Sequence, residues 1–250
     1  MPVELILFDL DDTLLRTGDL EGFRGREFLN RQPPAYVQRL TAQFGMLPNR
    51  IVYTEALLLA LQRQHEGAQL GVFTRSPRHY AETLLTLAYP NVEWETLVGF
   101  EDVTHTKPSG EGVLLAMRVA EVVLPQNVWL VGDGKSDVQA AYDAGCWCVL
   151  DQTTWPNARR SDDWKALERM PDAIIRSPDD LQGVLESPTE FLPVAERLQM
   201  LNGAAAGGVA FRFEKAGYFN PLVQGGRPTQ IHSLGRHFSR DAQRLSLIHI

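Results

Sequence analysis

The sequence contains only two cysteines, Cys146 and Cys148, and no run of 18 apolar residues. The lack of a long apolar run argues against a membrane-spanning helix. The first residues, MPVELILFDLDD, lack the basic segment with which a signal peptide begins. On a strand the two cysteines would share one face, which is a poor geometry for a disulfide. We therefore expect two buried, reduced thiols in a cytoplasmic protein.

The sequence also lacks an excess of positive charge. Its 24 lysine and arginine residues are outnumbered by 31 aspartate and glutamate residues, and the net charge is -7. Because nucleic acids attract basic surfaces, the main part of the chain is not expected to bind them. Residues 201–250 differ, with six basic and two acidic residues. This basic segment could contact an acidic partner, RNA or the surface of the main part of the chain itself.

Short apolar runs alternate with helical patterns from residue 3 to about residue 186. Strands are expected at 3–10, 69–74, 95–100, 127–133, 146–150 and 172–177, and helices at 54–66, 76–88, 108–123, 135–145 and 178–186. Thr54 and Ser76 are expected as helix N-caps, Pro77 as the first helical residue after Ser76, and Gly145 as a helix end. The alternation predicts an α/β fold, a three-layer Rossmann-like parallel sheet with helices on both faces.

The composition changes near residue 187, and we place a domain boundary there. Residues 1–186 are expected to form one domain, and 187–250 an unassigned basic segment that contains glycines. That segment has a helical pattern near Thr189 and a strand-like pattern around a glycine turn in AFRFEKAGYF. The final residues, RLSLIHI, resemble the translation of a sequencing adapter, and we expect the natural chain to differ after about residue 244.

Polar residues gather where the predicted strands end. They are Asp9, Asp11 and Thr13 after the first strand, Thr74 and Arg75 after the second, Lys107 before the helix at 108–123, and Gly132, Asp133 and Asp137 after the strand at 127–133. In parallel α/β sheets, ligands bind beyond the carboxyl ends of the strands. We therefore expect these residues to share one site.

The acids of this set point to a metal ion and to phosphate chemistry. Carboxylates at one place repel one another unless a cation compensates them. Without a histidine or cysteine partner they suit a hard cation, most simply Mg²⁺. An aspartate beside such an ion could attack phosphorus, and a second acid two residues later could transfer protons. Thr74 and Lys107 could bind the phosphoryl oxygens.

Four segments, in this order, resemble the motifs of the haloacid dehalogenase (HAD) superfamily, in the phosphatase branch that includes phosphoglycolate phosphatases. DLDDTL matches the motif DxDxT, and VFT at 72–74 matches an apolar strand that ends in Thr or Ser. Lys107 in HTKPSGEGV matches a lysine before proline, and VGDGKSD at 131–137 matches GDxxxD. The resemblance covers about residues 3–150 and implies a hydrolase with a Rossmann-like core.

The resemblance also implies roles for single residues. Asp9 would be the nucleophile and a metal ligand, and Asp11 the acid/base, with its backbone carbonyl on the metal. Thr13 would hold the motif loop by hydrogen bonds. Thr74 and Lys107 would bind phosphate. Asp133 would be a direct metal ligand, and Asp137 would act on the metal through water or a neighbouring ligand. Gly132 would be a structural residue. Arg75 stands where Asn is common in the family and would contact the phosphate or the rest of the substrate.

The core would comprise residues 1–15 and 53–186, with a small helical cap inserted at 16–52. Any of the cap arginines could meet an anionic substrate; they are Arg16, Arg24, Arg26, Arg31 and Arg39. The expected activity is Mg²⁺-dependent hydrolysis of a small phosphorylated metabolite through an aspartyl-phosphate. Two alternatives are a phosphomutase or phosphotransferase on the same core, and a non-catalytic phosphate-binding regulatory module. Asp11 argues against the dehalogenase branch, which lacks an acid at that place.

Other conspicuous residues are expected to have ordinary roles. Asp12 is expected in a solvated loop, and His79 and His105 at the surface or at helix caps. Four tryptophans are expected to be packing residues; they are Trp94, Trp129, Trp147 and Trp155. The sequence predicts neither the substrate nor the oligomeric state.

Overall fold

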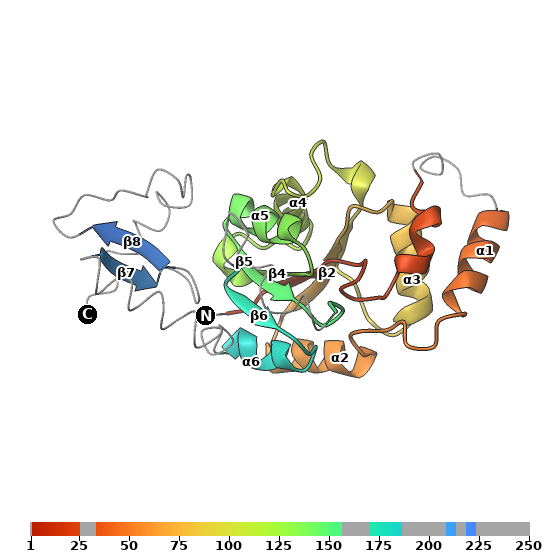
Figure 1. The fold of residues 1–250 in the computed structure, drawn as a ribbon, viewed down its shortest axis with the longest axis horizontal. Coiled ribbons are helices and arrows are strands. Elements are labelled where there is room, and N and C mark those ends of the chain that lie inside the picture. Colours follow the sequence, from red (N-terminus) through yellow and green to blue (C-terminus); the bar gives the residue numbers. More distant parts are fainter. Residues whose placement is uncertain (1, 26–33, 157–170, 187–208, 214–218, 224–250) are drawn as a thin grey trace.

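The computed structural model describes residues 2–25, 34–156, 171–186, 209–213 and 219–223. A six-stranded sheet in the order β3-β2-β1-β4-β5-β6 lies at its centre (Figure 1). The strands are β1 (Leu5–Phe8), β2 (Gln69–Phe73), β3 (Thr96–Val98), β4 (Val128–Gly132), β5 (Trp147–Asp151) and β6 (Ala173–Ile175). All neighbouring strands run parallel. The predicted α/β fold with a parallel sheet is confirmed.

Helices cover both faces of this sheet, which gives three layers (Figure 1). One face carries α2 (Glu55–Gln64), α3 (Arg78–Ala88) and α6 (Asp180–Glu186), and the other carries α4 (Glu111–Val119) and α5 (Lys135–Ala144). Successive side chains of a strand point to opposite faces. In β1, Ile6 and Phe8 accordingly join the first core, while Leu5 and Leu7 join the second. The almost continuous apolar run of β1 therefore reflects burial on both sides.

The predicted helix ends at Thr54 and Gly145 are correct, the helix expected at 108–123 is shorter, and the predicted start of α3 is wrong. The Thr54 side chain accepts a hydrogen bond from Leu57 N at 3.2 Å, and Gly145 ends α5 with a left-handed φ of 77°. At α3, Ser76 is not the N-cap and Pro77 is not the first helical residue, since Pro77 is the N-cap and the helix begins at Arg78. The Ser76 hydroxyl donates to Asp11 instead, and the carboxylate of Glu101 accepts the free backbone N–H of Arg78. A side chain distant in sequence thus takes the place of the expected local cap.

The insertion after β1 is helical in its described part, with the 3₁₀ helix η1 (Gly18–Phe23) and α1 (Pro34–Phe44). The two connections to the core lie side by side, because Arg16 N donates to Arg50 O and Val52 N donates to Leu14 O. The Arg50 side chain is only 2% exposed. Its guanidinium pairs with both carboxylate oxygens of Asp19, at 2.8 and 2.9 Å, and donates to Arg16 O at 2.6 Å. This arginine fixes the base of the insertion to η1.

Two short 3₁₀ helices, η3 (Phe100–Asp102) and η4 (Pro125–Asn127), complete the connections of the main sheet. Farther along the chain, β7 (Val209–Phe213) and β8 (Phe219–Val223) pair antiparallel, as the strand-like pattern around the glycine turn predicts. The helix expected near Thr189 lies outside the described residues. Cys146 and Cys148 are buried, as expected. Within the described ranges no helix is long and apolar enough to cross a membrane.

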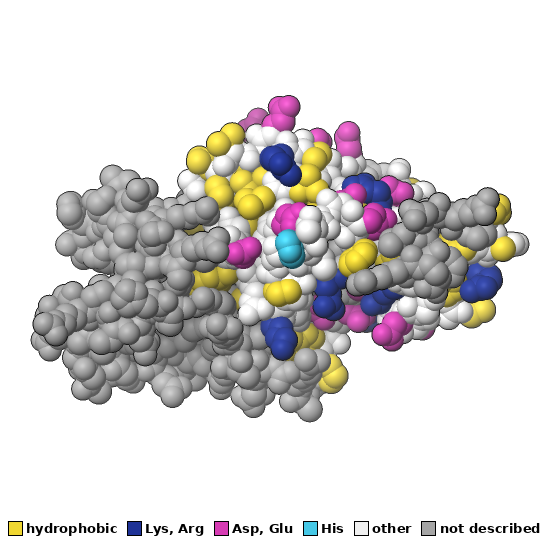
Figure 2. All heavy atoms as spheres, turned by 90° about the horizontal axis from the view of Figure 1, so that it is seen from above, with side chains coloured by type: hydrophobic (Ala, Val, Ile, Leu, Met, Phe, Trp, Pro, Cys, Tyr) yellow, Lys and Arg dark blue, Asp and Glu magenta, His cyan; other side chains and the backbone are white. Residues whose placement is uncertain are grey.

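The face covered by α4 and α5 mixes charged and apolar side chains (Figure 2). Several large apolar residues are exposed on and just after α4; they are Leu114, Val119, Val123 and Leu124. His105 lies near this helix with its side chain 75% exposed and paired with Glu111, as expected for a surface histidine. His79 was wrongly expected at the surface or at a helix cap, because α3 buries it against the ring of Tyr36 in α1.

Candidate active site

The candidate site lies where the strand order of the sheet reverses. The chain leaves β1 in one direction to β2 and β3, whereas β4, β5 and β6 lie on the other side of β1. Such a reversal opens a crevice at the carboxyl ends of the strands. Asp9 follows β1, and Asp133 follows the neighbouring β4. Both line a cleft of about 890 Å³.

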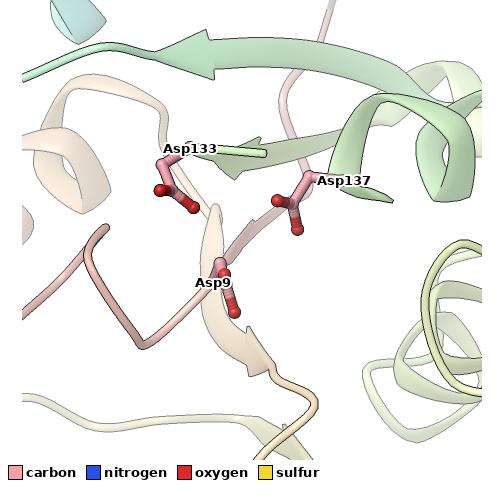
Figure 3. Close-up of side chains that lie close together, drawn as sticks. All are labelled: Asp9, Asp133 and Asp137. Carbon is pink, nitrogen blue, oxygen red and sulfur yellow. The ribbon is translucent and has the colours of Figure 1, made fainter. Parts of the chain in front are cut away.

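Asp9, Asp133 and Asp137 form a cluster in this cleft. Each offers a carboxylate oxygen, and these atoms lie within 4.8 Å of one another. Figure 3 shows the three side chains close together: Asp9 just after β1, Asp133 just after β4 and Asp137 in the first turn of α5. Gly132 allows this approach, since a Cβ there would lie 2.2 Å from Asp137 Cγ. The close contact, rather than a tight turn alone, is what requires glycine.

Lys107 is buried between two of these acids. Its Nζ lies 2.8 Å from Asp9 Oδ1 and 2.6 Å from Asp137 Oδ1. The ammonium also lies over the ring of Phe73, 4.9 Å from the centroid. The sequence-based role of Lys107 was phosphate binding. The structure brings it to the cleft and shows it as the cation that links Asp9 and Asp137.

One lysine does not compensate the whole acid cluster. Burial, followed by repulsion from Asp137 and Asp11, outweighs the attraction of Lys107 and raises the pKa of Asp9 to about 7. Burial, followed by repulsion from Asp9 and Asp137, raises the pKa of Asp133 to about 8. A divalent cation bound to these oxygens would favour the ionised carboxylates. Buried oxygen ligands that lack a full complement of positive charge therefore fit Mg²⁺.

The side chain of Asp11 faces a different set of groups. Arg24 Nη2 of the insertion lies 3.0 Å from Asp11 Oδ1, and the Tyr80 hydroxyl donates to the same oxygen at 3.1 Å. Asp11 Oδ2 accepts hydrogen bonds from the hydroxyls of Ser76, at 2.5 Å, and Thr74, at 3.4 Å. The metal role expected for Asp11 concerns its backbone carbonyl, which leaves the carboxylate for these contacts.

The remaining predicted residues differ in how well the structure supports them. Thr74 is fully buried at the end of β2 and lines the cleft, and its hydroxyl accepts a hydrogen bond from Ser76 N at 3.0 Å. Arg75 also lines the cleft, with an exposed side chain. The hydrogen bonds expected of the Thr13 side chain are not found, because its buried hydroxyl has no partner within the described part of the chain.

Sequence reasoning missed several residues of the site. Ser76 and Tyr80 were read as helix residues, and nothing local in the sequence shows that they reach Asp11. Asp12 was expected in a solvated loop. Its carboxylate instead accepts a hydrogen bond from Thr17 N at 3.1 Å, and its backbone has a φ of 59°. Trp155 packs in the core as expected, but its indole N–H also donates to Asp133 O at 3.0 Å.

Comparisons with known proteins identify the family of this chain and several relatives. The family model of haloacid dehalogenase-like hydrolases matches residues 20–150. Phosphoglycolate phosphatase of Escherichia coli (strain K12) is 32% identical over 126 residues, which are 50% of this chain and 47% of that protein. Validoxylamine A 7'-phosphate phosphatase of Streptomyces hygroscopicus subsp. limoneus is 32% identical over 108 residues, which are 43% of this chain and 50% of that protein. The chain thus spans about half the length of the curated relatives it matches.

Solved structures show the same fold. CbbY from Rhodobacter sphaeroides in complex with xylulose-(1,5)bisphosphate has a TM-score of 0.54 at 21% identity, covering 72% of this chain and 96% of that chain. A predicted phosphoglycolate phosphatase from Haemophilus somnus has a TM-score of 0.52 at 20% identity, covering 73% of this chain and 98% of that chain. The family match begins at residue 20, so the position of Asp9 and Asp11 at the site comes from the structure.

Proposed function

Because this chain belongs to the haloacid dehalogenase-like hydrolases, we propose that it is a Mg²⁺-dependent phosphatase that hydrolyses a small phosphomonoester through an aspartyl-phosphate. The observation that carries the proposal is the buried carboxylate cluster of Asp9, Asp133 and Asp137 beside Lys107 at the reversal of the sheet. The relatives with 32% identity are phosphatases of small phosphorylated compounds by name, which supports the same class of substrate.

The metal would be held by the carboxylates of Asp9 and Asp133 and by the backbone carbonyl of Asp11, with Asp137 acting on it directly or through water. Bound there, Mg²⁺ would compensate the charge of the phosphoryl oxygens and of the acids themselves. Lys107 orients Asp9 in this scheme. It contacts Asp9 Oδ1, which also accepts a hydrogen bond from Leu10 N at 2.9 Å. Asp9 Oδ2 has no hydrogen bond within the described ranges and is the oxygen that we assign to the attack.

In the first step, Asp9 Oδ2 forms a bond to phosphorus while the ester P–O bond breaks and Asp11 gives a proton to the leaving oxygen. In the second step, Asp11 takes a proton from water, the water oxygen bonds to phosphorus, and the bond to Asp9 breaks. Thr74 and Lys107 would bind the phosphoryl oxygens through both steps, and Arg75 would contact the phosphate or the rest of the substrate.

Residues 16–52 would act as the cap over the core, and residues 1–186 as one catalytic domain. Arg24 extends from the insertion to Asp11, and it lines the cleft together with Arg75. A cap that reaches the acid/base can exclude water from the cleft and restrict the size of the substrate. We also propose a cytoplasmic location, since the only two cysteines lie two residues apart, Cys148 in the buried strand β5 and Cys146 just before it, which is a poor geometry for a disulfide.

The test is phosphate release from a panel of phosphorylated metabolites with Mg²⁺ and with EDTA, including 2-phosphoglycolate, sugar phosphates and nucleotides. Spontaneous hydrolysis of phosphate esters is so slow that the site must lower the barrier by about 20 kcal/mol or more. We expect Asp9→Asn to abolish turnover, and the exposed control Asp179→Asn to retain it. Product analysis with a sugar acceptor separates hydrolysis from phosphotransfer. Phosphate binding without any turnover across the panel would favour the regulatory module instead.

A further inference from the structure

The segment that follows β5 touches both acidic loops of the site. The Thr154 hydroxyl donates to Asp12 O at 2.7 Å, in the loop after β1. The indole N–H of the next residue, Trp155, donates to Asp133 O at 3.0 Å, in the loop after β4. We infer that Thr154 and Trp155 form a clamp that holds the two loops at the separation needed for the metal. This inference deepens the proposed function and rests on it.

The loop after β1 needs such support, because Asp12 has a left-handed φ of 59°. Residues other than glycine rarely adopt this conformation without local hydrogen bonds. The Asp12 N–H donates to Leu15 O at 2.7 Å, and this N–H shares a peptide group with the carbonyl of Asp11. Thr154 fixes the other side of Asp12 through its carbonyl. The two bonds together set the direction of the Asp11 carbonyl, the proposed backbone ligand.

The loop after β4 is held in a similar way. The peptide group between Asp133 and Gly134 is bonded at both ends, because its carbonyl accepts from Trp155 and its N–H donates to Asp137 Oδ2 at 3.1 Å. Loss of the indole N–H would free this peptide group to rotate. A rotation would move the Asp133 side chain and would also weaken the bond that orients Asp137. Trp155 therefore influences two carboxylates of the cluster without contacting a substrate.

The clamp can hold the two loops in place because hydrogen bonds fix the clamp itself to the sheet. Gln152 N donates to Ile175 O at 2.9 Å, at the end of β6. Trp155 N donates back to Gln152 O at 3.1 Å, which closes a turn. The Trp155 side chain is 8% exposed and belongs to the core beneath α4 and α5. The family match ends at residue 150, before this segment.

The experiment measures Mg²⁺ binding by isothermal titration calorimetry of the full chain after removal of metal with EDTA. Trp155→Phe keeps most of the packing and removes the N–H donor. Thr154→Val keeps the shape and removes the hydroxyl, whereas Thr154→Ser restores it. Groups that orient metal ligands typically change metal affinity by 10- to 100-fold. We expect Kd for Mg²⁺ to rise about tenfold in the first two variants and to stay within about twofold of wild type in Thr154→Ser.

Two control variants separate positioning from general stability. Tyr53→Phe removes the hydrogen bond from the Tyr53 hydroxyl to Asp151 Oδ2 at 2.6 Å, next to the clamp, and keeps the ring contact with Phe8. Thr86→Val removes a hydroxyl that donates to Glu82 O at 2.8 Å on the exposed side of α3. We expect the first to lower the Tm and the second to have little effect, and both to bind Mg²⁺ like wild type.

The inference of a clamp would be overturned if both Trp155→Phe and Thr154→Val bind Mg²⁺ as tightly as wild type. It would also be overturned if Tyr53→Phe weakens Mg²⁺ binding as much as these two variants do. Should Trp155→Phe fail to fold by circular dichroism, the contrast between Thr154→Val and Thr154→Ser decides alone. A wild-type protein that binds Mg²⁺ but releases no phosphate would contradict the proposed function and leave the calorimetric result on the clamp valid. A wild-type protein that does not bind Mg²⁺ would overturn the clamp.

Discussion

The pH dependence of stability without metal tests the electrostatics of the acid cluster most directly. An aspartate in an unfolded chain has a pKa near 3.9 and is ionised between pH 5 and 7. In the folded, metal-free protein, burial raises the pKa of Asp133 to about 8, so that the group carries a proton in this range. Unfolding then releases a proton. The free energy of unfolding that Asp133 contributes must therefore fall as the pH rises.

One proton released on unfolding corresponds to about 1.4 kcal/mol per pH unit, or about 3 kcal/mol from pH 5 to pH 7. For a chain of this size, the difference amounts to about 6–12 °C in Tm. Asp9, with its pKa raised to about 7 by burial first and by neighbouring acids, acts in the same direction. His65 and His79 act in the opposite direction, because burial lowers the pKa of both histidines.

His65 and His79 contribute equally to the pH dependence of wild type and of a variant that keeps them, so their contribution cancels in the difference between the two proteins. We expect thermal unfolding in EDTA to show that the free energy of unfolding falls with pH more steeply in wild type than in Asp133→Asn. The difference between the two slopes should be about 1.4 kcal/mol per pH unit. Asp179→Asn, an exposed acid outside the cleft, should keep the wild-type slope. Saturating Mg²⁺ should shrink the difference, because the cation replaces the proton. Equal slopes for wild type and Asp133→Asn in EDTA would refute the argument that the cluster lacks positive charge.

Three further substitutions test separate parts of the structure. Gly132→Ala would place a Cβ 2.2 Å from Asp137 Cγ, and we expect calorimetry to show at least tenfold weaker Mg²⁺ binding in a folded protein. Arg50→Met removes the buried cation that pairs with Asp19, and urea unfolding should show a loss of about 2 kcal/mol. Arg75→Ala should raise KM several-fold and leave kcat nearly unchanged if Arg75 only binds substrate; an equal loss in kcat and kcat/KM would contradict that role.

Sequence patterns predicted the sheet well because each strand carries its own signal. The runs at 3–10 and 127–133 are apolar since both faces of β1 and β4 are buried. The position of the site followed from the same reasoning, because acids that leave neighbouring parallel strands must meet at one edge. Asp9 and Asp133 follow directly from the strand ends, and Asp137 lies one helical turn farther along, at the start of α5.

Contacts between residues distant in sequence were beyond the reach of these patterns. Ser76 precedes a helix in a way typical of an N-cap, yet its hydroxyl donates to Asp11. The competing partner lies 65 residues earlier in the chain, and local propensity carries no information about it. The same holds for Trp155, which an apolar pattern identifies as a packing residue while its indole N–H reaches Asp133 O. The polar atom of a buried aromatic residue needs a hydrogen-bond partner, and that partner can lie far away in the sequence.

Asp11 illustrates why the position of an acid and its orientation are different problems. Each of its carboxylate oxygens has two partners, and the four partners come from three segments. Arg24 and Tyr80 reach Oδ1, and Ser76 and Thr74 reach Oδ2. The backbone of the first loop fixes where Asp11 lies, but only the insertion, α3 and the end of β2 together fix where its carboxylate points. Because Arg24 is the one of these partners that the insertion supplies, any displacement of the insertion from the core must change the surroundings of the proposed acid/base.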